Sequence, residues 1–237
     1  MISIVIPVYP MHGHGAAMLT ELLDSLQKQT YQEYEVIVSD DSSDTSLQDI
    51  CGNYESVKYY RNPGAKGACS NLNNAIRHSK GSIIKPMFQD DQFLDTDALE
   101  KISTMKAPWC VLTSAHIGEP GAIPRADHNP YPNEDIYELA RGCNTYGSPS
   151  AVAWKRGGNG GEFGLRLAIN PFDENLKWLF DCDFYAQMVQ ENGQPEFIPS
   201  RVLIREWDGM ATRTIADGGV RIQELAYIES KYSNLRP

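Results

Sequence analysis

The sequence predicts an α/β protein built on a doubly wound sheet, and two observations support that fold class. Short apolar segments alternate with helical segments over the first hundred residues, which is typical of such sheets. Two of the apolar segments are followed by paired carboxylates, Asp40–Asp41 and Asp90–Asp91. Ligands of doubly wound sheets bind outside the carboxyl ends of the strands. We therefore expect both acidic pairs at the ligand-binding edge of the sheet.

The elements of the first half follow from their residue patterns. Residues 2–8 are apolar, largely β-branched and followed by a glycine-containing loop at 12–15, which predicts a buried parallel strand. Methionine and leucine recur at helical spacing between 18 and 29, which predicts an amphipathic helix. Further strands are expected at 34–39, 57–60 and 82–88, and further helices at 47–54 and 68–79. Because Pro86 cannot donate to a ladder, strand 82–88 should lie at a sheet edge or contain a bulge.

The second half is less regular. Residues 111–114 and 148–154 have the character of strands, and 176–192 forms the clearest helix, with one apolar side. Residues 117–132 are rich in glycine, proline and histidine, which predicts a long loop. The glycine cluster at 157–161 suits a mobile loop.

The composition is that of an ordinary globular protein. The 237 residues, 41% of them hydrophobic, are enough for one large domain with or without an appendage. The formal net charge is 21 − 31 = −10, which opposes nucleic-acid binding because phosphate contacts need a basic face. The five cysteines are scattered without a C-x-x-C pair, so neither a disulfide framework nor a zinc site is expected. With no membrane-spanning apolar run and no signal-peptide pattern, we expect a cytoplasmic protein.

Several short motifs follow one another in order along the chain. They begin with Ile4-Val5-Ile6-Pro7-Val8-Tyr9, Leu23–Thr30 and Glu35–Asp44, and continue with Asn71, Asn74-Ala75-Ile76, Gly81 and Asp90-Asp91. Gly147–Ser150, Phe172–Leu176 and Asp181-Cys182-Asp183 complete the set. From residue 2 to about residue 193, the sequence thereby resembles a family 2 glycosyltransferase of the GT-A fold. Each motif alone is weak evidence, but the ordered set is strong.

The resemblance implies a single domain over residues 1–237. Residues 1–95 would be the nucleotide-binding half of a Rossmann-like, doubly wound mixed sheet, and residues 96–237 an irregular acceptor-binding half with a C-terminal extension. It also implies a metal-dependent, inverting transfer of a sugar from a nucleotide-diphosphate donor, with UDP- or dTDP-sugars favoured. The acceptor would be a hydroxyl of a saccharide or of a lipid-linked molecule, and peripheral association with a membrane is compatible with this.

The residues expected on the donor side are Pro7, Val8, Tyr9, Asp41, Lys66, Asn71 and Asp90. In the family, the first strand and its loop meet the nucleotide; the alternative for Tyr9 is simple packing. Asp41 would accept the N3–H of uracil or thymine, while Asp40 or Asp44 could cap the next helix. Lys66 would contact the diphosphate or remain solvated.

The pair Asp90–Asp91 resembles the metal motif of the family. A hard cation such as Mn²⁺ or Mg²⁺ takes oxygen ligands and keeps several waters, so one or two carboxylates suffice. By the family pattern, Asp91 would coordinate the metal and Asp90 would reach the ribose. Phe88 or Gln89 stands where many members carry the first acid of the motif. One ribose or metal contact is therefore expected to be missing or altered.

An inverting transfer requires a base that takes the proton of the attacking hydroxyl. The resemblance assigns that role to Asp181, and Asp183 would orient it or bind the acceptor. Alternatively, the helix begins near Asp181, which would then be its N-cap. Ser148 and Ser150 would line the acceptor side or form an ordinary turn. Trp207 stands where family members often carry a histidine, so a ligand or phosphate contact is lost, or the indole stacks on a sugar.

Two other functions are compatible with the sequence. A catalytically silent GT-A domain would bind nucleotide-sugar or glycan; Gln89 and Trp207 favour it, whereas Asp91 and Asp181 oppose it. A nucleotidyltransferase would share the nucleotide-binding core. It would usually carry a glycine- and arginine-rich loop after the first strand, and that loop has no arginine here.

Overall fold

The structure of the protein, a computed structural model, describes residues 1–118, 125–159, 161–206 and 219–235. The strands are β1 (Ile2–Val8), β2 (Tyr34–Asp40), β3 (Val57–Arg61), β4 (Ile83–Pro86), β5 (Gln92–Phe93), β6 (Trp109–Ile117), β7 (Arg125–His128), β8 (Val152–Lys155) and β9 (Glu196–Arg205). The α-helices are α1 (Gly15–Gln27), α2 (Ser46–Cys51), α3 (Ala68–His78), α4 (Ala98–Ser103), α5 (Ile136–Ala140), α6 (Gly161–Ile169), α7 (Phe180–Asn192) and α9 (Val220–Lys231). Short 3₁₀ helices are η1 (Met11–Gly13), η2 (Pro149–Ala151) and η3 (Ser233–Leu235).

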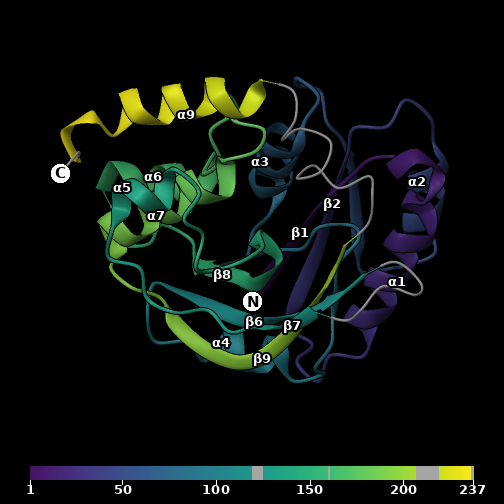
Figure 1. Cartoon of the computed structure of the whole chain (residues 1–237). Coiled ribbons are helices and arrows are strands. Elements are labelled where there is room, and N and C mark those ends of the chain that lie inside the picture. Colours follow the sequence, from purple (N-terminus) through teal and green to yellow (C-terminus); the bar gives the residue numbers. More distant parts are fainter. Residues whose placement is uncertain (119–124, 160, 207–218, 236–237) are drawn as a thin grey trace.

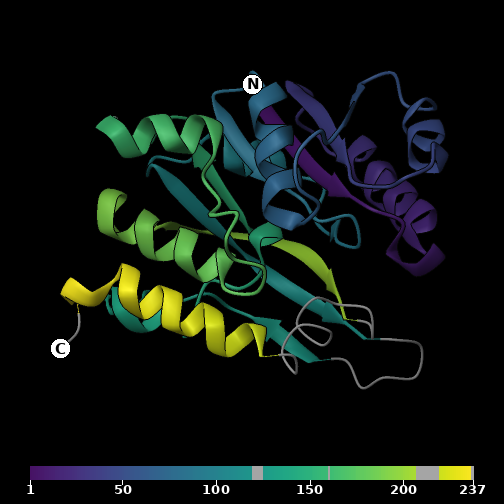
Figure 2. The same cartoon turned by 90° about the horizontal axis from the view of Figure 1, so that it is seen from above.

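The strands form one nine-stranded mixed sheet with the order β3-β2-β1-β4-β8-β6-β9-β5, and β7 pairs with β6 off this path. Helices α3, α6 and α7 lie on one side of the sheet and α4 on the other (Figure 1). Seen from above, α6, α7 and α9 lie in a row beside the sheet (Figure 2). The predicted α/β class with a mixed sheet is confirmed.

The first half is the regular part of the fold. β1 pairs in parallel with both β2 and β4, and β2 with β3, so β1 is central and all seven of its residues are buried. This burial on both faces is the reason for its continuous apolar sequence. The predicted strands and helices of residues 2–79 are present, with ends that differ by a few residues.

The expectation that strand 82–88 lies at an edge is wrong. β4 lies between β1 and β8. Pro86 is tolerated there because it is the last residue of the strand, and the β8 ladder has already ended at Ile84. The Met87 amide then donates to Val5 O at 3.0 Å, so the bonding to β1 resumes one residue later.

The second half departs from the sequence prediction in three places. Residues 125–128 of the expected long loop form β7, which pairs with β6. The expected strand at 148–154 begins as η2, and only its later part joins the sheet as β8. The helix expected from residue 176 starts at Phe180, and the preceding amides of residues 177–179 donate to Glu224 of α9.

A single hydrophobic core underlies both halves. Aromatic rings dominate it below the second half: Trp154 and Phe184 lie 4.9 Å apart between ring centroids, as do Phe172 and Phe184. β5 belongs by position to residues 1–95, yet it pairs with β9. The predicted single domain and its internal division stay predictions.

The cysteines and the possible membrane spans can be compared with the expectations from the sequence. All five cysteines lie among them and are free, and only Cys143 is exposed. No helix in the described part of the chain is long and apolar enough to cross a membrane.

Candidate active site

The predicted donor residues meet at one edge of the sheet, where β1, β2 and β4 end. Val8 pairs with Asp40 in the β1–β2 ladder, and the Asp41 amide donates to Val8 O at 3.0 Å. The loop after β1 and the segment after β4 are joined by a side chain from Gln89, which bonds to the Tyr9 amide. The two acidic pairs thus lie at the ends of β2 and β4, the strands on either side of β1, at the edge where the sequence predicts them.

The two acids after β2 have different surroundings. Asp40 is fully buried, and its carboxylate accepts from the Ser42 amide at 2.7 Å and from the Tyr59 hydroxyl at 2.6 Å. Asp41 is half-buried and accepts from Asn62 Nδ2 at 2.7 Å and from the Gly67 amide at 2.8 Å. Asp40 thus stabilises the turn, whereas Asp41 keeps an accessible carboxylate for a ligand.

Gln89, the residue that departs from the family pattern, holds the loop after β1. Its side chain is 1% exposed; Oε1 accepts from the Tyr9 amide at 2.9 Å and Nε2 donates to Gly15 O at 2.7 Å. The backbone at Gly15 lies very close to Tyr9. A Cβ added at Gly15 would be only 2.6 Å from Tyr9 O. Met11 has a left-handed backbone, with φ 48°. Gln89 therefore fixes an unusual loop conformation next to Asp90.

Asp90 and Asp91 differ in exposure. Asp91 is 3% exposed; its carboxylate accepts from the Arg205 amide at 3.2 Å and contacts the Ser150 hydroxyl. Burial, and then the charge of Asp90, raise the pKa of Asp91 well above its ordinary value. Asp90 is half-buried, and it lies close enough to Tyr9 that its charge adds to the effect of burial in raising the pKa of the Tyr9 phenol.

The buried Lys85 lies beneath this pair. Its ammonium group donates to Pro86 O at 3.1 Å and also to Ser150 O. Burial lowers the pKa of Lys85 to about 7, and the Asp91 charge opposes that shift. The Ser150 hydroxyl also accepts from the Phe88 amide at 2.9 Å. Ser150 thus connects the segment before β8 with the acidic pair, and its hydroxyl is occupied by these contacts.

The acidic pair fits a hard divalent cation. No three His, Cys, Asp or Glu side chains gather as a metal-binding group within the described ranges. Asp90 and Asp91 would supply two carboxylates to a cation that takes its remaining ligands from phosphate and water. The mutual repulsion that raises the Asp91 pKa is also what a cation would relieve.

Asp181 lies in the first turn of α7, and that turn packs on the segment that precedes the acidic pair. The ring of Phe180 lies 6.2 Å from the ring of Phe88 between centroids, so the two segments pack together. Asp181 Oδ1 accepts from the Cys182 amide at 2.8 Å, and Oδ2 accepts from Asn144 Nδ2 at 3.1 Å. The residue is partly exposed, yet crowding by protein raises its pKa to about 6. Leu179, not Asp181, is the N-cap of α7.

Asp183 faces away from this arrangement and binds the helix α9. It is fully buried, and its carboxylate accepts from Lys231 Nζ at 2.9 Å, Tyr232 Oη at 2.9 Å and Gln187 Nε2 at 2.7 Å. An acceptor contact by Asp183 stays a prediction, and it would have to compete with these three donors.

The remaining predicted residues are placed as follows. Pro7 and Val8 are buried in β1, and Asn71 Nδ2 donates to Val8 O at 3.0 Å, while the buried Asn71 Oδ1 has no partner in the described structure. Tyr9 is 40% exposed at the ligand edge. Lys66 is exposed in the loop before α3.

Ser148 is the N-cap of η2 and accepts from the Ser150 amide. Trp207 lies outside the described residues.

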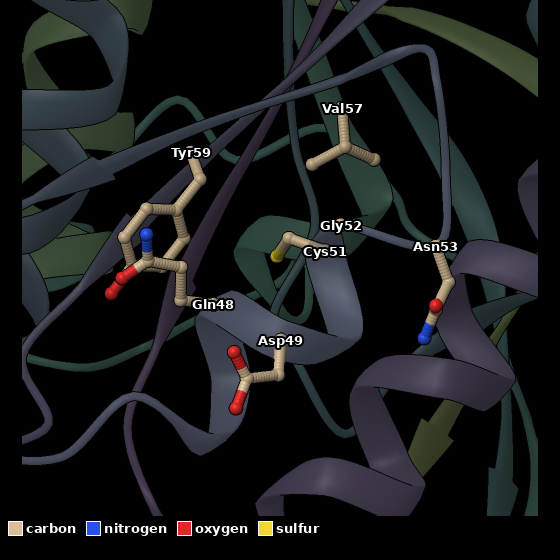
Figure 3. Close-up of a pocket in the computed structure, with 7 residues that line it drawn as sticks. All are labelled: Gln48, Asp49, Cys51, Gly52, Asn53, Val57 and Tyr59. Carbon is tan, nitrogen blue, oxygen red and sulfur yellow. The ribbon is translucent and has the colours of Figure 1, made fainter.

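A hollow of about 510 Å³ lies between α2 and β3 (Figure 3). It is lined by Gln48, Asp49, Cys51, Gly52, Asn53, Val57 and Tyr59, none of which belongs to the predicted site. Tyr59 links it to the site only indirectly, through its bond to the buried Asp40. Burial raises the pKa of Cys51 to about 12, so its thiol is not a ready nucleophile. We assign the hollow no part in the chemistry.

This edge of the sheet brings the residues expected on the donor side together with the carboxylate pair. The chain belongs to glycosyltransferase family 2, because the family model described as "Glycosyl transferase family 2" matches residues 3–184. An uncharacterized glycosyltransferase of Rickettsia typhi is 34% identical over 234 residues, 90% of this chain and 66% of the relative. An Escherichia coli UDP-Glc:alpha-D-GlcNAc-diphosphoundecaprenol beta-1,3-glucosyltransferase is 31% identical over 44% of this chain and 41% of its own length.

Solved structures confirm the predicted GT-A fold. Staphylococcus aureus TarS 1–349 in complex with UDP-GlcNAc has a TM-score of 0.67 and 19% identity, covering 96% of this chain and 66% of that one. The mannosyltransferase PcManGT of Pyrobaculum calidifontis, in complex with GDP-Man and Mn²⁺, has a TM-score of 0.58 and 14% identity, covering 100% and 76%. At these identities the likeness concerns the fold. The chain spans less than two thirds of the length of the curated relatives above.

Proposed function

We propose that the protein transfers a sugar, with inversion and with a divalent cation, from a UDP- or dTDP-sugar to a hydroxyl of a lipid-linked or polymeric glycan. The observation that carries this proposal is Asp181, a partly exposed carboxylate with its pKa raised to about 6. A base with a pKa near the working pH is the efficient kind. Its segment packs on Phe88, two residues before Asp90.

The proposed step is a single displacement. The acceptor hydroxyl oxygen forms a bond to the anomeric carbon while the bond from that carbon to the diphosphate oxygen breaks. The hydroxyl proton passes to the Asp181 carboxylate, and the nucleoside diphosphate leaves with both electrons of the broken bond. A bound Mn²⁺ or Mg²⁺ would offset the negative charge that accumulates on the diphosphate.

The donor would lie along the edge formed by β1, β2 and β4. Asp41, with both oxygens already oriented by Asn62 and Gly67, would accept the N3–H of the base. Tyr9 and the backbone of Val8 would border the nucleotide. UDP as the nucleotide is supported by the TarS complex, which holds UDP-GlcNAc, and by the UDP-Glc in the name of the Escherichia coli relative, whereas the PcManGT complex holds GDP-Man.

The acidic pair would hold the cation, with the roles of its members open to test. The sequence assigns the metal to Asp91, but the half-buried Asp90 is the more accessible of the two. We propose that both carboxylates are required. Asp91 supports the site from the buried side, where Ser150 and the Arg205 amide orient it.

The proposal is tested by calorimetric binding of UDP and UDP-GlcNAc, with and without Mn²⁺, and by the rate at which UDP is formed from UDP-GlcNAc. Asp181→Asn should bind UDP within about twofold of the original protein but release UDP at least about 100-fold more slowly, because only the base is lost. Asp90→Asn and Asp91→Asn should abolish the Mn²⁺-dependent part of UDP binding. Asp49→Asn, an exposed change at the hollow behind the site, is the matched control and should change neither.

The proposal fails if none of UDP, dTDP, GDP and their sugars binds more tightly with Mn²⁺. If binding is metal-dependent but Asp181→Asn keeps the full rate of UDP release, only the assignment of the base is wrong.

A further inference from the structure

Asn144 makes four hydrogen bonds at the point where the loop before η2 meets α7. Its Oδ1 accepts from the amides of Tyr146 at 3.0 Å and Gly147 at 2.9 Å. Its Nδ2 donates to Gly147 O at 3.0 Å and to Asp181 Oδ2 at 3.1 Å. Both N–H groups and both lone pairs of the amide are thereby used.

These contacts fix which end of the amide faces Asp181. Because two backbone N–H groups point at Oδ1, that atom has to be the acceptor, and the NH₂ group has to face the carboxylate. The turn is itself held in place: Gly147 has φ +85°, and its carbonyl also accepts from the Tyr185 hydroxyl at 3.1 Å. The donor that Asn144 presents to Asp181 is therefore preorganised by the backbone.

Four hydrogen bonds hold the Asp181 carboxylate, three of them from groups of its own helix. The Cys182 amide bonds Oδ1 from within the helix, and Asn144 bonds Oδ2 from a loop 37 residues away. The Cys182 thiol and the amide of Asp181 itself also bond to the carboxylate, so Asn144 is the partner from outside α7. Without Asn144, the hydrogen bonds to the Asp181 carboxylate would come from its own helix, as the one from the Cys182 amide does.

We propose that Asn144 is a positioning residue for the base Asp181, orienting its carboxylate and stabilising the ionised form. The inference rests on the proposed function, in which Asp181 takes the proton of the acceptor hydroxyl. It adds a residue that touches neither donor nor acceptor and acts only through Asp181.

The electrostatics agree with this role. Burial raises the pKa of Asp181, and its hydrogen bonds, including the one from Asn144, counteract that rise. The other titratable groups that interact with Asp181 are Cys69 on α3 and Cys182 and Tyr185 on α7, and burial raises the pKa of each. These three stay neutral between pH 5 and pH 8, so none of them changes charge as Asp181 titrates in that range.

Asn144→Asp separates positioning from loop structure. Aspartate has the same shape and can still accept from the Tyr146 and Gly147 amides, but it presents an oxygen to Asp181 in place of an N–H. The lost donor and the added like charge both raise the pKa of Asp181, by about one unit or more. Asn144→Ala, which removes donor and acceptors together, should raise it less.

The matched control is Asn133→Asp. Asn133 also bonds the loop backbone, donating to Cys143 O at 3.0 Å and accepting from the Asp135 amide at 3.0 Å, and it makes no contact with Asp181 in the described structure. The same chemical change nearby should leave the Asp181 titration where it was.

Two measurements on the full chain give the result. The first is a ¹³C titration of labelled aspartate carboxyls, with the Asp181 signal assigned by its loss in Asp181→Asn. The second is UDP release from UDP-GlcNAc with Mn²⁺ between pH 5 and pH 9. Because a protonated Asp181 cannot accept a proton, the rate falls as the pH drops through its pKa. We expect both midpoints to move upward by about one pH unit in Asn144→Asp, with the rate recovering at pH 9.

Unmoved midpoints in both Asn144 variants would overturn the inference, as would an equal shift in Asn133→Asp. Should Asn144→Asp fail to fold, Asn144→Ala decides in the same way. Failure of the proposed function looks different: Asp181→Asn would then keep its full rate of UDP release, whatever the titration shows.

Discussion

Gln89 occupies a position in the metal motif where an acid is expected. Its side chain forms hydrogen bonds to the loop after β1. It bonds the backbone of Tyr9 and Gly15 and so ties the nucleotide loop to the acidic pair. An acid at this position would face the Gly15 carbonyl without a donor. The departure from the family pattern is thus explained by loop support, and it no longer favours a catalytically silent domain.

Gln89→Ala should weaken UDP binding by about tenfold without changing the fold. Two buried backbone groups lose their partner, at about 1 kcal/mol each, and the loop is freed from its bound shape. Gln92→Ala removes a comparable side chain whose amide bonds Glu21 at the surface, and it should change binding by less than twofold. Calorimetric titration of UDP measures both. Equal affinities in the two variants would contradict the role given to Gln89.

At the residue scale, the sequence could predict acids but not their neighbours. Asp41, Asp90 and Asp181 are identified by motif and by position after a strand or at a helix. Asn144 is not, because an asparagine in a loop is indistinguishable from an ordinary turn residue. Its role depends on a contact across 37 positions, which only the folded chain brings about.

Among the elements, α9 shows why part of the second half escaped prediction. Its buried residues are Glu224 and Ile228, so the helix has no continuous apolar stripe. It is attached through polar groups instead. Glu224 accepts from the amides of residues 177–179, and Lys231 bonds Asp173 at 2.8 Å and Asp183 at 2.9 Å. A search for hydrophobic periodicity therefore finds nothing to recognise.

Glu224→Gln should lower the melting temperature by about 5 °C. The amide places an NH₂ group against backbone N–H donors, leaving buried groups unsatisfied at a cost of about 2 kcal/mol. Glu229→Gln, on the same helix, weakens a surface pair with Arg141 at 3.3 Å and should shift melting by about 1 °C or less. Differential scanning fluorimetry at pH 7.5 compares them. A shift in Glu224→Gln no larger than in Glu229→Gln would show that α9 is held by other contacts.

For the molecule as a whole, the sequence was informative where the chain repeats a strand and a helix. The first half does so, and its parallel strands are buried apolar runs. The second half mixes parallel and antiparallel pairs, and β5 and β9 join from distant parts of the chain. Pairing of that kind is decided by packing between remote segments, which no local pattern encodes.

The continuous sheet also limits how the molecule can move. β4 of the half expected to bind the donor is hydrogen-bonded to β8 of the half expected to bind the acceptor, and the ladder continues through β6 to β9. A hinge between the halves would have to break these bonds, so closure around a substrate by domain rotation is not available. In the proposed function, substrate binding would then be accommodated by the loops and not by a rotation of the two halves.

Small-angle X-ray scattering tests this rigidity through the radius of gyration. A compact chain of this length has a radius of gyration of about 18 Å. Saturating UDP and Mn²⁺ should leave the measured value unchanged within error, whereas contraction on binding would mean that the halves do move. Substitutions in the loops of the second half could then change acceptor preference. The edge formed by β1, β2 and β4 would keep its geometry.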